Sequence, residues 1–221
     1  MDYGLYLIET GLADAEQTLT EHRLPAPTFN WAVVHEILHR GRRIVDNQGL
    51  ADQMRASFNA DQLQAFNTIV SAITDNPQTA HFYLQGPGGT GKTFLYKALC
   101  YYYRAQGKTV LCVASTGIAG LLLPDGRTSH SQFRIPLDLT ASSTCSVTKQ
   151  SQIGKLLAKA DLIIWDEVPM QHKFCFTAVH RLFIDIRSVK GPNEPLFGGV
   201  PVIFGGDFAQ ILPVVVNGSR T

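Results

Sequence analysis

The sequence predicts an α/β protein in which a mainly parallel β-sheet is covered by helices on both faces. Short apolar runs alternate with amphipathic segments along most of the chain, which is the pattern of successive strand–helix units. The runs at 109–114, 162–165 and 199–204 are apolar almost throughout, as expected for strands buried on both faces. With 221 residues, 45% of them hydrophobic, the chain is long enough for one such domain and an extension.

The first 57 residues predict a small helical extension. Apolar residues recur at roughly helical spacing in Asp2–Glu9 and again in Trp31–Leu38. The segment Leu24–Thr28 predicts a break between them, and the polar run Asp46–Gly49 predicts a second break.

The α/β domain is expected to occupy residues 58–221. Its first helix has an apolar face from Leu63 to Ile73, with Asn59 as the N-cap and Asp75–Pro77 as the stop signal. The elements expected after it are the strand His81–Leu84, the helix Lys92–Tyr103, the strand Thr109–Ala114, the short helix Gly117–Leu123, the turn Pro124–Arg127, the Ser/Thr-rich mobile loop Leu139–Lys149, the helix Ile153–Lys159, the strand Leu162–Trp165, the helix Phe174–Ile186, the loop Pro192–Pro195 and the strand Gly199–Phe204.

Charge and cysteine content narrow the classes of partner. The formal net charge is +1, so a contact with nucleic acid should be a local groove and not a wholly basic surface. Four cysteines lie far apart without a C-x-x-C pair, which argues against a zinc site. Cys100 and Cys112 stand in apolar runs and predict buried thiols, as in a reducing, intracellular compartment.

No membrane partner is expected. No apolar run approaches the ~20 residues that span a bilayer. The N-terminus also lacks the pattern of a secretory signal peptide.

A phosphate-binding loop is the most specific signal in the chain. The segment Gly86–Thr93 matches G-x-x-x-x-G-K-[ST] between an expected strand and an expected helix, a context that disfavours a chance glycine-rich turn. Glycines allow backbone N–H groups to curl around phosphate, and the helix N-terminus adds partial positive charge. Lys92 is expected to reach the β- and γ-phosphates, and the Thr93 hydroxyl to ligate Mg²⁺. The expected ATP-binding residues of this loop are Gly86, Pro87, Gly88, Gly89, Thr90, Gly91, Lys92 and Thr93.

Two acidic residues follow the apolar strand 162–165. Asp166 is the expected Mg²⁺ ligand, mostly through water, and Glu167 is the expected general base for an attacking water. Adjacent carboxylates suit a hydrolase that turns over quickly, whereas the alternative is a solvated strand end. Together with the loop they predict a P-loop, three-layer α/β sandwich that hydrolyses ATP with Mg²⁺.

A third strand end carries a neutral amide. Gln210 follows the strand 199–204 and the glycines Gly205 and Gly206, and parallel strands bring their carboxyl ends to one edge. The amide can hydrogen-bond γ-phosphate or water there, so Gln210 is a candidate sensor. The alternative is that it caps a turn.

These segments resemble the superfamily-one DNA helicases of the petite integration frequency (PIF) type. The resemblance runs from about Phe58 to the end of the chain, and a weaker one, including the run Asp2–Glu9, points to the helicase domain of Helitron transposons. The segments that carry it, in order, are Asn59–Gln62, Gly86–Thr93, Ala114–Ala119, Gly126–Ser131 with Phe133–Pro136, Asp166–Met170 and Gly205–Pro213.

The resemblance adds expectations for individual residues. It implies that Gln62 reads adenine, although Asn59 and Gln62 also fit a capping box. It implies that His130 and Phe133 contact bases of single-stranded DNA and that Arg134 contacts a phosphate, whereas a structural histidine and a surface arginine are the alternatives. Thr116 and Gly117 open a helix after an apolar strand, which suits a DNA phosphate but also a plain N-cap.

The function implied is ATP hydrolysis coupled to 5′→3′ movement along single-stranded DNA. DNA repair, recombination and telomere maintenance are associations of the family, and a nuclear location follows from the Helitron resemblance. Ala209 stands where many members have arginine, and Pro169 replaces a serine. The chain stops just after the third motif, so we expect the second RecA-like lobe to be absent and to come from a longer parent chain or a partner.

Three other functions remain compatible with the sequence. A non-helicase P-loop ATPase, such as a clamp-loader-like assembly factor, would show no DNA-stimulated hydrolysis. A catalytically incomplete remnant of a mobile element would act as a binding module or not at all. An adaptor would borrow its second lobe from another chain.

Overall fold

The computed structural model describes residues 31–189, 191 and 194–210, with residues 18–28 and the single residues 2, 5, 8, 9 and 12; for 31–43 it describes the backbone only. The chain divides into two compact units, Met1–Asp46 and Asn47–Thr221. The elements are α2 (Trp31–Ala56), α3 (Ala60–Asp75), η1 (Pro77–Thr79), β1 (His81–Gln85), α4 (Lys92–Ala105), β2 (Thr109–Ala114), α5 (Gly117–Leu121), β3 (Arg127–Thr128), α6 (Ser129–Phe133), α7 (Gln152–Ala158), β4 (Ala160–Asp166), η2 (Val168–Met170), α8 (Lys173–Ile186), η3 (Leu196–Gly199), β5 (Val202–Gly206) and η4 (Phe208–Gln210).

A five-stranded sheet in the order β1-β5-β4-β2-β3 forms the centre of the second unit, and all of its strand pairs are parallel. The register places Gln85 opposite Gly206 and Ala114 opposite Asp166. The carboxyl ends of β1, β5, β4 and β2 therefore reach the same edge of the sheet, as the sequence predicts.

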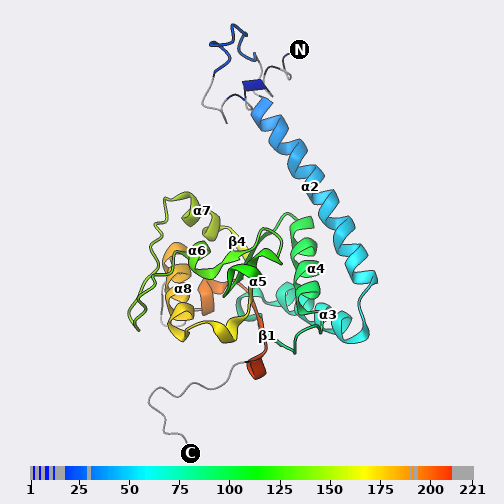
Figure 1. The fold of residues 1–221 in the computed structure, drawn as a ribbon, viewed down its shortest axis with the longest axis vertical. Helices are drawn as coiled ribbons and strands as arrows, with labels where there is room; N and C mark the ends of the chain where they lie inside the picture. Colours follow the sequence, from blue (N-terminus) through cyan, green and yellow to red (C-terminus); the bar gives the residue numbers. More distant parts are fainter. Residues whose placement is uncertain are drawn as a thin grey trace, which may run out of the picture. The chain divides into compact units, whose positions relative to one another are not determined.

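Side chains alternate between the two faces of the sheet, as the pleat of a strand requires. Val110, Cys112, Leu162, Ile164 and Ile203 pack into one buried cluster with α3 and α4. Their neighbours along the strands pack into the other cluster with α7, α8 and Phe133; these are Leu111, Val113, Ile163, Trp165 and Val202. Figure 1 shows α3 and α4 on one side of the sheet and α8 on the other. The predicted three-layer α/β sandwich is confirmed.

One predicted break is wrong. The helix α2 runs from Trp31 to Ala56 without interruption through Asp46–Gly49. A glycine inside a helix costs only about 1 kcal/mol, and the Nε2 of Gln48 donates to Asp52 one turn later at 2.9 Å. The C-terminal part of α2 also packs on the sandwich, because Ala51 is fully buried and Met54 contacts the first core cluster.

Other elements match the sequence closely or differ at their ends. The break at Leu24–Thr28 is present, whereas half of the residues of Asp2–Glu9 lie outside the described part of the chain. The last strand begins at Val202 and not at Gly199, because Leu196–Gly199 forms a 3₁₀ turn in which Phe197 and Gly198 have positive φ. The two-residue strand β3 and the short helix α6 were not predicted, since neither is long enough to show a period.

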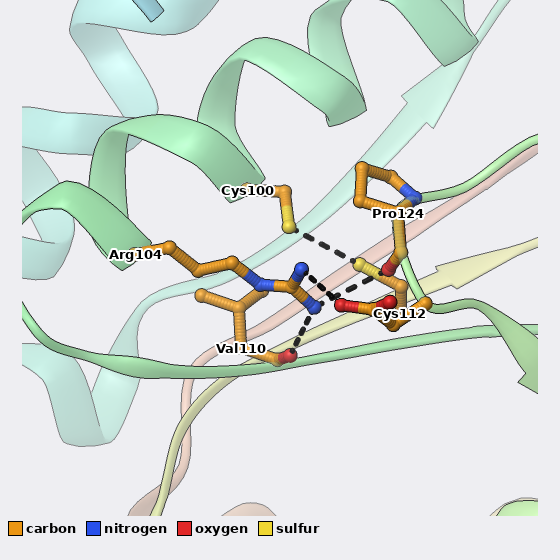
Figure 2. Close-up of polar contacts among 6 residues, drawn as sticks. Cys100, Arg104, Val110, Cys112 and Pro124 are labelled. Carbon is orange, nitrogen blue, oxygen red and sulfur yellow. Dashed lines mark hydrogen bonds and ion pairs between the residues drawn. The ribbon is translucent and has the colours of Figure 1, made fainter. Parts of the chain in front are cut away.

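An arginine joins α4, the strand β2 and the turn at Pro124–Asp125 (Figure 2). Arg104 on α4 donates to the carbonyl oxygens of Val110 and Pro124 at 3.3 and 3.2 Å, and it pairs with Asp125 at 2.6 Å. The thiols of Cys100 and Cys112 lie beside it, with their sulfur atoms 3.6 Å apart. Both cysteines are buried, which confirms that prediction, and the arginine fixes the end of α4 against β2.

No helix in the described ranges is both long and apolar enough to cross a membrane.

Candidate active site

The loop between β1 and α4 borders a cleft of about 700 Å³. Six residues of the predicted phosphate loop line it, namely all but Gly88 and Thr93, and Gln62 and Tyr83 line the same cleft. Gly91 is the N-cap of α4 with φ of 87°, a backbone conformation that other residues adopt at a cost. The helix N-terminus thus opens directly onto the cleft, as phosphate binding requires.

Lys92 closes the loop on itself. Its Nζ donates to the carbonyl oxygens of Gly86 at 2.5 Å and of Pro87 at 3.2 Å. A lysine ammonium has three donors and no acceptor, so these carbonyls hold it inside the curve of the loop. The position is the one from which it would meet phosphate oxygens.

Gln62 serves two contacts at once. Its backbone N–H donates to Asn59 Oδ1 at 2.8 Å and its Oε1 accepts from Asn59 N at 3.2 Å, which is a complete capping box on α3. Its Nε2 donates to the carbonyl of Thr90 at 3.3 Å. The predicted capping role is therefore confirmed, and the side chain also lies against the phosphate loop, whereas contact with adenine stays a prediction.

The acidic pair ends β4, as predicted. Asp166 is only 4% exposed, and its Oδ1 accepts from the backbone N–H of Glu167 at 2.9 Å. Burial raises the pKa of Asp166, while the Glu167 N–H and the Lys92 charge oppose that rise. Burial and the neighbouring Asp166 also raise the pKa of Glu167, and Lys92 opposes this shift too. The positive charge of Lys92 on the phosphate loop thus lowers the pKa of both carboxyl groups, against the effect of burial.

The end of β5 approaches the same place. A β-carbon on Gly205 would collide with the Tyr96 hydroxyl and would lie 3.4 Å from Asp166 Oδ1, so only glycine fits there. Asp207 is nearly buried and accepts from Ala209 N and from Gln210 Nε2, each at 3.0 Å. Gln210 is exposed in η4, and its side-chain amide donates to Asp207, which is the residue that caps this turn. Capping by Gln210 itself and sensing of γ-phosphate both stay predictions. Residues 211–213 of the third motif lie outside the described part.

Two aromatic residues of the site were missed. Tyr96, one turn into α4, is fully buried beside Gly205, and burial followed by the charges of Asp166 and Glu167 raises the pKa of its hydroxyl. Tyr83 on β1 borders the cleft and contacts Phe208, with ring centroids 5.2 Å apart. The alternation along β1 and the i, i+4 step from Lys92 to Tyr96 were the signals available.

The residues predicted to contact DNA follow β2 and β3. Thr116 and Gly117 are exposed directly after β2, and Thr116 caps α5 by accepting from Ala119 N at 3.3 Å. His130 is half-buried on α6, and Arg134 is exposed at its C-terminus with φ of 54°. Because Ala114 pairs with Thr128, the structure brings these two segments together.

The prediction that Phe133 contacts DNA bases is wrong. The resemblance implied contact with bases, but this side chain is completely buried in the second core cluster. Its ring centroid lies 5.5 Å from that of Trp165 and 6.0 Å from that of Phe183. An aromatic ring buried against two others cannot also stack on a base, so its contribution is to stability.

Comparison with known proteins agrees with this site. Residues 57–221 match the model of the PIF1-like helicase family, and the chain belongs to this family. It is 36% identical over 146 residues to ATP-dependent DNA helicase PIF4 of Trypanosoma brucei brucei, covering 62% of this chain and 17% of that protein. It is 28% identical over 170 residues to ATP-dependent DNA helicase PIF1 of Xenopus laevis, covering 76% of this chain and 24% of that protein.

Solved structures give the same result. The crystal structure of Bacteroides Pif1 bound to single-stranded DNA superposes with a TM-score of 0.57 and 29% identity, over 72% of this chain and 34% of that one. Another structure similar to this chain is Bacteroides Pif1 with ADP-AlF3 and single-stranded DNA, with a TM-score of 0.57 and 28% identity. The chain spans about a third of these solved proteins, and less than a quarter of the two curated relatives.

Proposed function

We propose that this chain is the ATP-hydrolysing, single-stranded-DNA-binding lobe of a 5′→3′ DNA helicase. One observation carries the proposal: a single edge of the sheet holds the phosphate loop after β1, the acidic pair after β4, Gln210 after β5, and the exposed Thr116–Gly117 after β2. A nucleotide and a nucleic-acid strand bound at this edge would be separated only by the ends of neighbouring strands. Rigid strands that connect two sites can carry the coupling of hydrolysis to movement.

The residues present fit a Mg²⁺ ion bound with ATP. The hydroxyl of Thr93 and the carboxylate of Asp166 are hard oxygen donors, which Mg²⁺ prefers. The buried Asp166 carboxylate is costly without nearby positive charge, as the direction of its pKa shift indicates. Mg²⁺ would neutralise charge on the phosphate oxygens. The described residues contain no cluster of three His, Cys, Asp or Glu side chains that could hold a metal ion without ATP.

Three side chains would each have a separate role in ATP hydrolysis. Lys92 binds phosphate oxygens once they replace the loop carbonyls as its partners. Glu167 accepts a proton from the attacking water, and its raised pKa makes it a stronger base than a solvated carboxylate. Gln210 hydrogen-bonds the γ-phosphate or the water from the end of β5. We expect slow hydrolysis, because stabilisation of γ-phosphate charge from a second lobe is worth roughly 10³–10⁵ in rate in related enzymes.

Single-stranded DNA would follow the ends of β2 and β3. The exposed residues Thr116 and Gly117 at the start of α5 and the guanidinium of Arg134 suit phosphates, and His130 suits a base or a sugar. The solved complex of Bacteroides Pif1 with single-stranded DNA supports this assignment by its similarity over 72% of the chain.

Steady-state ATPase activity with and without oligo(dT) tests the proposal. We expect DNA to raise the rate, both Lys92→Ala and Glu167→Gln to abolish it, and the chain alone not to unwind a duplex. Thr74→Ala, which removes a helix-surface hydroxyl bond to Val70 O away from the cleft, is a matched control. Hydrolysis that is insensitive to DNA would favour a non-helicase ATPase, and ATP binding without hydrolysis would favour a catalytically incomplete module.

A further inference from the structure

The backbone of the acidic pair is held by a serine that directly follows the neighbouring strand β2. Ser115 donates its backbone N–H to the carbonyl of Asp166 at 3.2 Å and its Oγ to the carbonyl of Glu167 at 2.6 Å. Glu167 has φ 53° and ψ 38°, a left-handed conformation that is unfavourable for a residue with a side chain. The hydroxyl of Ser115 therefore holds a strained peptide in the orientation that presents the Glu167 side chain.

Ser115 also belongs to the segment proposed for DNA. It lies between the last residue of β2 and Thr116, the N-cap of α5. A phosphate bound at Thr116 and Gly117 would be one residue from the group that holds Glu167. Thr116 follows Ser115 directly in the chain.

A second hydrogen bond joins the far end of the segment 167–171 to α6, the helix that carries the proposed DNA contact His130. The Oγ of Ser129, which is completely buried, donates to Gln171 Oε1 at 2.8 Å. Gln171 follows η2, and its Nε2 donates to the Cys175 sulfur at 2.8 Å. Ser129 directly precedes His130 on α6. The segment 167–171 is thus fixed at its first residue by Ser115 and at its last by Ser129.

We infer that Ser115 and the Ser129–Gln171 hydrogen bond are positioning contacts that transmit DNA occupancy to Glu167, and nucleotide occupancy back to the DNA segments. The inference rests on the proposed function. A contiguous network of hydrogen bonds between two sites can carry a coupling free energy, and that energy must act equally in both directions. Ser115, Ser129 and Gln171 themselves need touch neither ligand.

The test measures binding and needs no hydrolysis. The affinity for adenylyl imidodiphosphate with Mg²⁺ is measured with and without saturating oligo(dT), and the affinity for labelled oligo(dT) with and without saturating nucleotide. The ratio is the coupling factor, which is typically about 5- to 150-fold in allosteric proteins. The variants are Ser115→Ala and Ser129→Ala, with Gln171→Met as a second way to remove the buried bond if Ser129→Ala does not fold.

Two controls separate coupling from general damage. Ser115→Thr keeps the hydroxyl and should restore coupling. Ser57→Ala removes a hydroxyl that donates to Gln53 O at 3.1 Å on another part of the unit, and it should leave coupling unchanged.

We expect Ser115→Ala and the loss of the Ser129–Gln171 bond each to lower the coupling factor severalfold, with each single-ligand affinity within about twofold of the parent protein. A coupling factor equal to that of the parent in both kinds of variant overturns the inference and leaves the proposed function standing. Lower single-ligand affinities at an unchanged ratio show a merely structural role and also overturn it. A parent protein without coupling also overturns the inference, whereas the proposed function is decided separately by whether DNA raises the rate of ATP hydrolysis.

Discussion

The side-chain amide of Gln62 lies directly against the α-carbon of Gly91, so closely that a β-carbon at Gly91 would collide with the amide nitrogen. The first helix of the domain is thereby attached to the N-terminus of the phosphate-loop helix. This contact makes Gln62 a structural residue of the cleft before any nucleotide binds.

The two roles of Gln62 can be separated with its capping partner. Asn59→Ala and Gln62→Ala each break the capping box, and each should lower the free energy of unfolding by about 0.5–2 kcal/mol, measured by urea titration. Only Gln62→Ala removes the amide from the cleft, so only this change should weaken ATP binding more than GTP binding. Equal losses for ATP and GTP in both variants would limit Gln62 to capping.

A second prediction concerns Gly205 and Tyr96. Gly205→Ala should lower the free energy of unfolding by about 1–3 kcal/mol, because its methyl group meets the buried Tyr96 hydroxyl. That hydroxyl has no hydrogen-bond partner within the described residues, so Tyr96→Phe should be neutral or stabilising and should recover part of the loss in the double variant. Gly88→Ala, where a β-carbon meets nothing within 4 Å, is the control. Equal stability of the Gly205 and Gly88 variants would contradict the close approach.

The corrected role of Phe133 leads to a third prediction. Phe133→Ala should destabilise the protein by about 3–5 kcal/mol, because it empties a fully buried site between Trp165 and Phe183. His130→Ala, three residues earlier and half-buried, should change stability much less and should weaken binding of oligo(dT). Thermal melts and fluorescence anisotropy measure the two effects. The reverse pattern would restore Phe133 as a DNA contact.

Acid should destabilise the protein partly through His81. Burial lowers the pKa of this imidazole, and an opposing backbone contact with Gln78 only reduces the effect. Below the unfolded value of about 6.5 the unfolded chain binds a proton that the folded chain resists, so stability is present above that pH and is lost as pH falls. His81→Phe should retain the packing with Phe197 and lose less stability between pH 7.5 and 5, measured by urea titration. A drop as large as that of the parent protein would show that His81 does not contribute.

Local patterns predicted the strands and the phosphate loop because their signals are contained in a few neighbouring residues. The apolar run at 109–114 became β2 with the expected bounds, and Gly86–Thr93 lies between a strand and a helix as its spacing required. The predicted break at Asp46–Gly49 failed for a related reason: local breaking signals were outweighed by the helix on either side and by burial of Ala51.

Features that depend on contacts between residues far apart in the sequence could not be predicted from local patterns. Burial of Phe133 depends on Trp165 and Phe183, which belong to other elements, so its motif position alone could not exclude contact with bases. The hydrogen bond from Ser115 to the carbonyl of Glu167 depends on the pairing of β2 with β4. No spacing rule within one segment reports such a pairing.

The strand order also has a consequence for synthesis of the protein on the ribosome. β1 carries the phosphate loop, and its partner in the described sheet is β5, with His81 opposite Val202. At about 5–20 residues per second, residue 202 is made roughly 6–24 s after residue 81. During that interval the first strand has no sheet neighbour, although β2 and β4 can already pair. The strand that carries the phosphate loop is therefore the one whose pairing in the sheet is delayed longest, and its hydrogen-bonding edge stays unpaired in the nascent chain until β5 has been made.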